Sequence, residues 1–187
     1  MNDGKLALFL MLGQTATRTI LAQPNVVPSQ SLPLSDTFDL AVMAPEEVRL
    51  AIATSEPYQL FFVFERYLRA VIVETLSKDG TEEWWPKVDS PIQEEVLKLE
   101  ETDEVKAWMA LGSRDRSALL TYPQLLAIID KNWKDYFQDL LRDKALIQEG
   151  RWISHIRNAV CHMSAVPDEE LERIRQVMRD WFRVLPP

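Results

Sequence analysis

The side chains that offer the most chemistry lie together in one short segment, residues 151–162, with the sequence RWISHIRNAVCH. The segment holds both histidines of the chain, and imidazole is the side chain that exchanges protons near neutral pH. It also holds two arginines, whose planar guanidinium groups bind anions through a fork of N–H donors. Proton transfer and anion binding are therefore the chemistry that these residue types provide.

A helix is predicted over residues 143–160, and it would sort these side chains onto two faces. At about 100° per residue, Ile153, Ile156 and Val160 form an apolar face toward the core. The opposite face gathers Arg151, His155, Asn158 and His162.

Arg157 is the exception, because it falls only roughly 40° from Ile153, on the edge of the apolar face. A guanidinium there needs a carboxylate, helix-end carbonyls or a second chain, since burying an unpaired charge is costly. Alternatively, its stem packs against the core edge while its head reaches water.

Each of these residues also has a purely structural interpretation. The polar face of the helix is equally typical of an ordinary solvated surface, and Cys161 of a small buried apolar residue. Glu65, Arg66 and Arg69 lie at spacings of three and four residues, which also fit routine surface ion pairs on a helix.

The elements that must position this segment read as helices throughout, so the predicted fold class is all-α. A short helix is predicted over residues 45–54, with Pro45 in its first turn. A second and longer helix is predicted to start at Ser55-Glu56-Pro57 and to end at Asp79-Gly80.

Later helices are predicted to begin at Ser90 and Thr121, each followed three residues on by Gln in a capping-box pattern. The last helix, which starts at Pro167, carries an apolar stripe that must pack against another helix. A purely helical adaptor that binds a partner through this stripe is one possible interpretation. The stripe consists of Leu171, Ile174, Met178, Trp181 and Leu185.

The first 43 residues are predicted to be separate from the helical domain of residues 44–187. Roughly the first 20 residues read as an amphipathic helix, and residues 23–36, QPNVVPSQSLPLSD, as a Pro/Ser-rich linker. The apolar run at residues 6–12 is too short to span a membrane, which takes about 20 apolar residues. We expect no membrane segment and a cytoplasmic location.

Composition narrows the functional classes. The 187 residues suit one domain with a moderate core, and the net charge of −8 argues against non-specific coating of nucleic acid. The acidity is local, because residues 82–104 carry nine acidic and two basic side chains, whereas residues 105–187 carry eleven and thirteen. One Cys and two His are too few for a zinc site or a disulfide framework. We expect no metal and no other cofactor.

Four features follow one another along the chain. They are FERYLR at residues 64–69, the pair Trp84-Trp85, Lys131-Asn132-Trp133 with Phe137, and Ile156-Arg157-Asn158 with His162. Their order resembles the HEPN domain superfamily, in particular the branch appended to certain PIN-domain RNA-surveillance endonucleases. The resemblance covers about residues 55–185 and implies an up-and-down helical bundle, here with an additional N-terminal helix.

The resemblance also implies an activity. Many HEPN domains are metal-independent endoribonucleases that act as homodimers, with the Arg…His motifs facing each other across the interface. The 2'-hydroxyl of the RNA is then the nucleophile, and a 2',3'-cyclic phosphate is left. His162 is expected to transfer protons, Arg157 to bind the phosphate oxygens, and Asn158 to orient the phosphate or His162. The single-stranded RNA is expected to contact Arg151, His155, Glu65 and Arg69.

One geometric condition follows. On an ideal helix Arg157 and His162 stand about 140° and roughly 7.5 Å apart, so they do not reach one phosphate together. Either the helix ends or bends before His162, or the site uses residues of both chains.

The expected biological role is a toxin or defence effector held in check by an antitoxin or another regulatory protein. In HEPN toxins that nucleotidyltransferase antitoxins inactivate, a tyrosine two residues after the histidine is modified with AMP. Ser164 occupies that position here, which argues against this route. The alternative function is a non-catalytic HEPN module for dimerisation or for binding a nucleotide or a protein.

Overall fold

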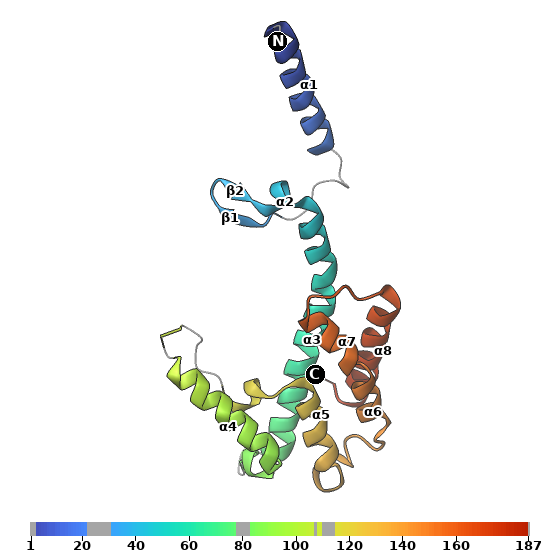
Figure 1. Cartoon of the computed structure of the whole chain (residues 1–187). Helices are drawn as coiled ribbons and strands as arrows, with labels where there is room; N and C mark the ends of the chain where they lie inside the picture. Colours follow the sequence, from blue (N-terminus) through green and yellow to red (C-terminus); the bar gives the residue numbers. More distant parts are fainter. Residues whose placement is uncertain (1–2, 22–30, 78–82, 107, 110–114, 187) are drawn as a thin grey trace. The chain divides into compact units, whose positions relative to one another are not determined.

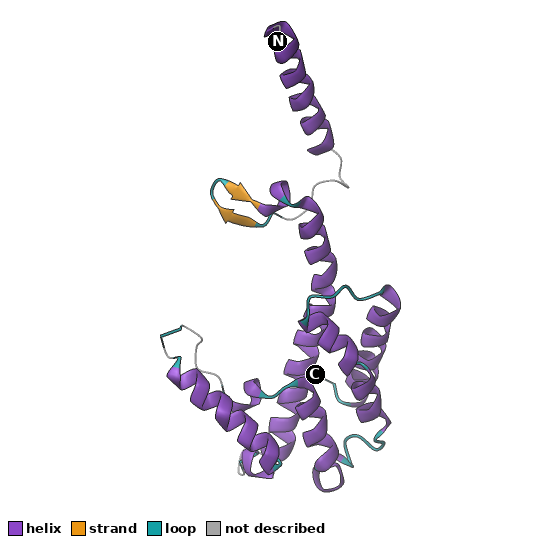
Figure 2. Cartoon of the chain, in the orientation of Figure 1, coloured by secondary structure: helices purple, strands orange, loops and turns teal. Residues whose placement is uncertain are grey.

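The computed structural model describes residues 3–21, 31–77, 83–106, 108–109 and 115–186. Within these residues helices dominate, and the strands form a single two-stranded sheet (Figure 2). The predicted all-α fold with an additional N-terminal helix is confirmed. Internal contacts divide the chain into two compact units, residues 1–55 and 56–187.

The first unit contains a hairpin that the sequence did not predict. Ser31, Leu32 and Ala41 all donate hydrogen bonds to the carboxylate of Asp39, over 2.7, 3.0 and 2.9 Å. The Ser31 bond, followed by those from Ala41 and Leu32, holds the pKa of Asp39 below its usual range. Residues 31–36 are thus part of a folded turn, and residues 23–30 of the predicted linker lie outside the described residues. The elements are α1 (Asp3–Leu21), β1 (Pro33–Ser35), β2 (Phe38–Asp39) and α2 (Leu40–Met43).

Helix α3 (Pro45–Ser77) is one element where two were predicted. The predicted break at Pro57 rested on its missing N–H, which removes a helical hydrogen bond. In the structure the hydroxyls of Thr54 and Ser55 donate to the carbonyls of Leu50 and Ile52, at 2.9 and 2.7 Å. These bonds lie in the turn before the proline. The carbonyl that loses its helical donor is that of Ala53, four residues before Pro57, and the helix nevertheless continues through the proline. The division between the two units falls within this helix.

The second unit is built around the later part of α3, with α4 on one side and α6, α7 and α8 on the other (Figure 1). Its short elements are two 3-10 turns, η1 and η2, and a π-helical turn, η3. The order is η1 (Trp85–Lys87), α4 (Ser90–Val105), η2 (Arg116–Leu119), α5 (Tyr122–Lys131), η3 (Trp133–Phe137), α6 (Ala145–Trp152), α7 (Ser154–Cys161) and α8 (Asp168–Val184).

The core of this unit forms on one face of α3. The ring of Phe64 packs edge-on against Trp181 of α8, with centroids 5.9 Å apart, and tilted against Tyr122 of α5 at 6.1 Å. The stripe predicted on α8 points into this same core, so it is not a free surface for a partner, and the adaptor interpretation loses its basis. Its buried members are Leu171, Ile174, Met178 and Trp181.

The helix predicted over residues 143–160 is two helices, α6 and α7, which meet at Ile153. The hydroxyl of Tyr122 donates to the Gly150 carbonyl at 2.8 Å, and in a continuous helix that carbonyl would accept from Ser154. Glycine permits this approach, because a Cβ at position 150 would lie 3.0 Å from the Leu126 side chain. The break interrupts the ideal geometry on which the common polar face was predicted.

Candidate functional site

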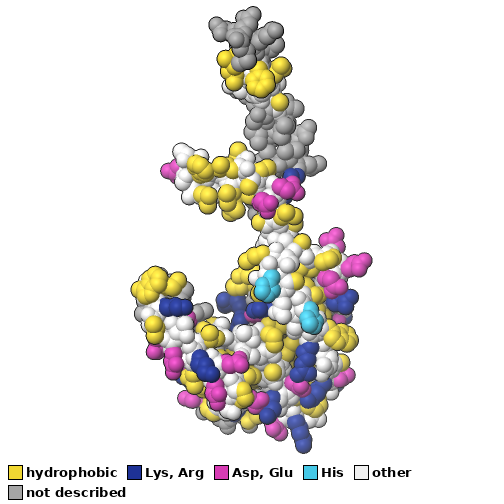
Figure 3. Space-filling model, in the orientation of Figure 1, with side chains coloured by type: hydrophobic (Ala, Val, Ile, Leu, Met, Phe, Trp, Pro, Cys, Tyr) yellow, Lys and Arg dark blue, Asp and Glu magenta, His cyan; other side chains and the backbone are white. Residues whose placement is uncertain are grey.

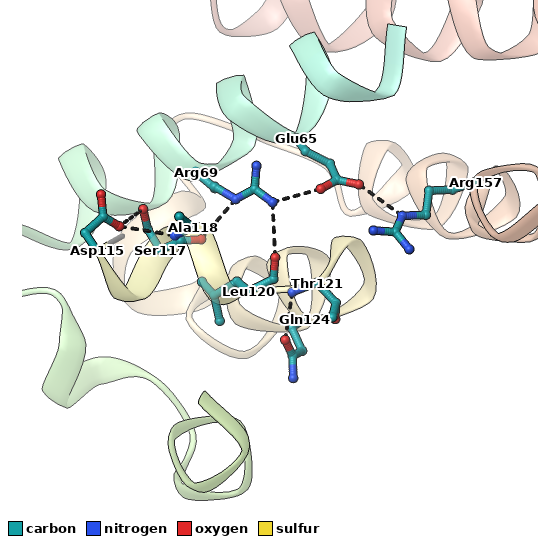
Figure 4. A network of polar contacts seen from close by, with 9 residues as sticks. All are labelled: Glu65, Arg69, Asp115, Ser117, Ala118, Leu120, Thr121, Gln124 and Arg157. Atoms are coloured by element: carbon teal, nitrogen blue, oxygen red, sulfur yellow. Dashed lines mark hydrogen bonds and ion pairs between the residues drawn. The ribbon is translucent and has the colours of Figure 1, made fainter. Parts of the chain in front are cut away.

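A chain of charged side chains links α7 to α3 (Figure 4). The Nε of Arg157 donates to Oε1 of Glu65 at 3.1 Å, and Nη2 of Arg69 donates to Oε2 of the same carboxylate at 2.8 Å. Glu65 is only 9% exposed, and each of its oxygens serves one arginine. Several partners were predicted as alternatives for the Arg157 guanidinium, and the structure shows that its partner is a carboxylate, that of Glu65.

Arg69 extends this network to the segment that precedes α5. Its Nε donates to the Ser117 carbonyl at 2.9 Å, and its Nη2 donates to the Leu120 carbonyl at 3.1 Å. Beside it, the hydroxyl of Ser117 donates to the Asp115 carboxylate, and this bond is the main reason that the pKa of Asp115 lies below its usual range. The Arg69 guanidinium that binds Glu65 is thus itself held by two backbone carbonyls.

The bond that Arg157 donates to Glu65 leaves the two terminal nitrogens of the guanidinium available. Among the contacts of the described residues, only its Nε is engaged, and Figure 4 shows the two terminal nitrogens directed away from Glu65. The side chain is 25% exposed and lines a groove of about 400 Å³ between α3 and α7. Other residues of this groove are Tyr58, Phe61, Phe62, Glu65, Arg69, Ala118, Val160 and Cys161.

The end of α7 determines where His162 lies. The helix ends at Cys161, and the His162 N–H donates to the Asn158 and Ala159 carbonyls at 3.0 and 3.1 Å. Met163 follows in the left-handed region with φ 56°, which turns the chain out of the helical path. Because this N–H still bonds the carbonyl four residues back, His162 keeps its helical position, and the chain turns away only after it. The offset between Arg157 and His162 expected of an ideal helix is therefore not removed by the end of α7.

His155, Asn158 and His162 are exposed. Figure 3 shows both histidine side chains on one face of the molecule, with Lys and Arg side chains close by. Among the described residues, those that line the groove of Arg157 include neither histidine nor Asn158. Within one chain, the structure places the predicted proton-transfer group outside the predicted phosphate site.

Arg151 belongs to a different cluster. Its Nη2 donates to Asp130 of α5 at 2.7 Å, and Lys144 donates to the same carboxylate at 2.6 Å. The Lys144 bond is the main reason that the pKa of Asp130 lies below its usual range; burial opposes this shift and the Arg151 bond adds to it. Contact of RNA with Arg151, His155, Glu65 or Arg69 stays a prediction.

Sequence reasoning did not single out Tyr58 and Phe62, whose rings stack with centroids 6.3 Å apart on α3. Their four-residue spacing, next to arginines on the same helix, was the available signal. Their exposure, 61% and 52%, is visible only in the structure.

Two features are absent among the described residues, a cluster of metal-binding side chains and a helix that could cross a membrane. No three of their His, Cys, Asp and Glu side chains gather as metal ligands do. None of the helices that the structure describes combines the length and the apolarity that crossing a bilayer requires.

Comparison with known sequences gives one family. The sequence model of the family described as Swt1-like HEPN matches residues 59–185, more than half of the chain. No curated protein and no solved structure matches the chain significantly. The matched segment contains the whole Arg157–Glu65–Arg69 network and both histidines, and it confirms the resemblance to HEPN domains.

Proposed function

Because the chain belongs to the Swt1-like HEPN family, we propose that it is a metal-independent endoribonuclease that acts as a homodimer. Family membership supports a nuclease or RNA-binding module. The cleavage reaction and the site at the dimer interface are the further steps of the proposal.

The observation that carries the proposal is the state of Arg157. A nearly buried carboxylate holds one nitrogen, the other two have no partner among the residues that the structure describes, and the side chain lines a groove. A guanidinium fixed in this way suits the non-bridging oxygens of a phosphorane, because its planar fork makes two parallel hydrogen bonds without reorganising.

The reaction needs no bound metal, because the RNA carries its own nucleophile. The 2'-oxygen attacks the adjacent phosphorus and loses its proton, while the bond from phosphorus to the 5'-oxygen breaks and that oxygen gains a proton. A 2',3'-cyclic phosphate and a 5'-hydroxyl result. In a homodimer, two copies of His162 are present, one for each proton transfer. This arrangement accounts for a histidine that lies outside the groove of its own chain.

Asn158, exposed one helical turn before His162, is proposed to orient the phosphate or the imidazole. Arg151 and His155 are proposed to contact the flanking RNA. Glu65 and Arg69 are proposed to act mainly by positioning Arg157, since both hold the same network. In the cell, the enzyme is proposed to be a cytoplasmic toxin or defence effector that a regulatory partner restrains.

The second candidate function is a non-catalytic HEPN module for dimerisation or for binding a nucleotide or protein. It is favoured by one observation, the separation of His162 from the residues that line the groove. A dimer whose histidines face away from both grooves would keep the binding function alone.

The test is cleavage of end-labelled single-stranded RNA by the full chain in EDTA, with the product ends analysed for cyclic phosphate. We expect His162→Ala and Arg157→Ala each to slow cleavage at least about a hundredfold, the usual effect of losing an acid–base or an oxyanion group. Arg173→Gln is the matched control, because this arginine of α8 is 57% exposed. His155→Ala is expected to raise KM and to leave kcat unchanged.

Two results would contradict the proposal. One is wild-type protein that leaves varied single-stranded RNAs intact while it binds them, which supports the non-catalytic module. The other is His162→Ala protein that cleaves as fast as the wild type.

A further inference from the structure

Three side chains of α3 form a continuous strip along one helix face. Tyr58, Phe62 and Arg66 follow at four-residue intervals, and such residues are neighbours on a helix. The two rings stack at 6.3 Å with an interplanar angle of 30°, and the Arg66 guanidinium carbon lies 5.7 Å from the centre of the Phe62 ring. All three side chains are exposed. Folding therefore leaves two large aromatic side chains and a cation in contact with water.

The strip borders the groove of Arg157. Tyr58 and Phe62 line that groove, and Phe62 also lines a second groove of about 660 Å³ that continues past Arg66 and Arg69 to Trp84. Because both grooves share Phe62 and Arg69, they adjoin. Exposed aromatic rings thus run beside the fixed guanidinium.

The charges along this path are mixed, with a cationic excess near the strip. Three arginines, Arg66, Arg69 and Arg157, face two carboxylates. Glu65 is shared between two of these arginines. Asp115 lies in the second groove, where it accepts from the Ser117 hydroxyl and, at 3.1 Å, from the Ala118 N–H. A polyanion is therefore favoured along Tyr58, Phe62 and Arg66 and disfavoured beyond Arg69.

We infer that Tyr58, Phe62 and Arg66 are a stacking subsite for unpaired RNA bases, next to the phosphate that Arg157 binds. The inference rests on the proposed function, since it concerns the same RNA. Aromatic rings bind bases of any sequence through their π faces, and an arginine adds a cation–π contact and a phosphate contact. The strip extends over roughly 12 Å of helix, which fits a short run of bases.

A stacking subsite predicts two preferences of the protein among RNA substrates. Base-paired RNA keeps its base faces stacked inside the duplex, so single strands bind better. Purines have larger π faces than pyrimidines, so a preference for purines beside the cut site follows from stacking strength.

The experiment measures binding without cleavage. The probe is a fluorescent 2'-O-methyl oligoadenylate, which has no free 2'-hydroxyl and therefore cannot be cut, and the readout is its anisotropy with the full chain. We expect Phe62→Ala and Arg66→Gln each to raise Kd at least about fivefold, the lower end of the loss for one base–aromatic stack. Phe62→Trp is expected to retain binding, and annealing the probe to its complement is expected to weaken it.

Two variants serve as controls. Trp108→Ala removes an aromatic side chain that is 82% exposed and lines neither groove, and Arg173→Gln removes an exposed charge on α8. Both are expected to bind as the wild type does. Light scattering of each variant reports its oligomeric state.

The outcomes separate this inference from the proposed function. Normal probe binding by both Phe62→Ala and Arg66→Gln overturns the stacking subsite, even if the wild type cleaves RNA. Loss of the dimer in Phe62→Ala with an unchanged Kd also overturns it, because the strip is then a protein contact. Probe binding that depends on Phe62, in a protein that cleaves no RNA, supports the subsite and contradicts the nuclease.

Discussion

Arg157 and Glu65 lie 92 residues apart in the sequence, yet the Nε of one is 3.1 Å from the Oε1 of the other. This contact joins α7 to α3 and sets the direction in which the guanidinium points. Arg69 donates to the second oxygen of the same carboxylate at 2.8 Å, so the carboxylate that orients Arg157 is itself held in place.

Removing the shared charge tests this relationship. Glu65→Gln leaves two arginines that are only 20% and 25% exposed without their common partner. We expect the free energy of unfolding to fall by about 2–4 kcal/mol, slightly less than for a fully buried pair because both guanidiniums reach some water. Chemical denaturation followed by tryptophan fluorescence measures it. The control, Glu172→Gln, removes a carboxylate that is 58% exposed and should change stability by less than about 0.5 kcal/mol. A loss below about 1 kcal/mol for Glu65→Gln would show that the pair is not structural.

Gly150 is predicted to tolerate no side chain, although alanine is the better helix former. An added Cβ would meet Leu126 at 3.0 and 3.2 Å and the Tyr122 hydroxyl at 3.4 Å, and both side chains are buried. We expect Gly150→Ala to destabilise the protein by about 1–3 kcal/mol through overpacking. Thermal unfolding measures this, with Gly13→Ala as the control, because nothing lies within 4 Å of a Cβ there. An increase in stability for Gly150→Ala would mean that the Leu126 and Tyr122 side chains of α5 move aside without a loss of packing energy.

Met163 holds a left-handed conformation, φ 56°, while it is 87% exposed. Glycine adopts this region without steric cost, so Met163→Gly should raise the free energy of unfolding by about 0.5–1 kcal/mol. Met163→Ala removes the same side chain and keeps the strain, so it should bring no gain. Equal stability of the two variants, compared by thermal unfolding, would disprove the strain at this position.

Acid should weaken the link between α5 and α6. The Lys144 hydrogen bond and then that of Arg151 keep the pKa of Asp130 below its usual range, so the folded state favours the carboxylate. Its contribution, about 1 kcal/mol for a partly exposed cluster, is complete above the ordinary aspartate pKa. It is lost as the pH falls through the lowered pKa of the folded state. Unfolding curves of the wild type and Asp130→Asn should therefore differ at neutral pH and converge in strong acid. Asp139→Asn, at an exposed position, is the control, and a gap that persists in strong acid would exclude the carboxylate as its cause.

Local signals in the sequence predicted most helix starts. Thr121 and Gln124 form the expected capping box, with the Thr121 N–H donating to the Gln124 side chain at 2.8 Å. The break between α6 and α7 was not predictable in this way, because the contact beside it joins the Gly150 carbonyl to the Tyr122 hydroxyl, 28 residues earlier. Likewise, proline chemistry predicted a helix boundary at Pro57, whereas the structure keeps Pro57 inside α3.

The candidate site shows the same limit. The position of Arg157 on the edge of the apolar helix face indicated that its guanidinium needs a hydrogen-bond acceptor, and spacing along one helix is enough to predict this. The identity of that partner required the packing of α7 on α3, which no spacing within either helix encodes. Tyr58 and Phe62 were missed because periodicity does not distinguish an exposed aromatic side chain from a core residue.

The core contacts of α3 also have a consequence for the timing of synthesis. The hydroxyl of Tyr67 donates to the Leu185 carbonyl at 2.7 Å across 118 residues, and Phe64 packs against Trp181. At ordinary rates of translation, a ribosome needs roughly 6 to 24 s to add that length of chain. Until α8 has left the ribosome, α3 lacks these partners. The core around α3 is therefore complete only after α8 has been made, although α8 supplies none of the residues that line the groove of Arg157.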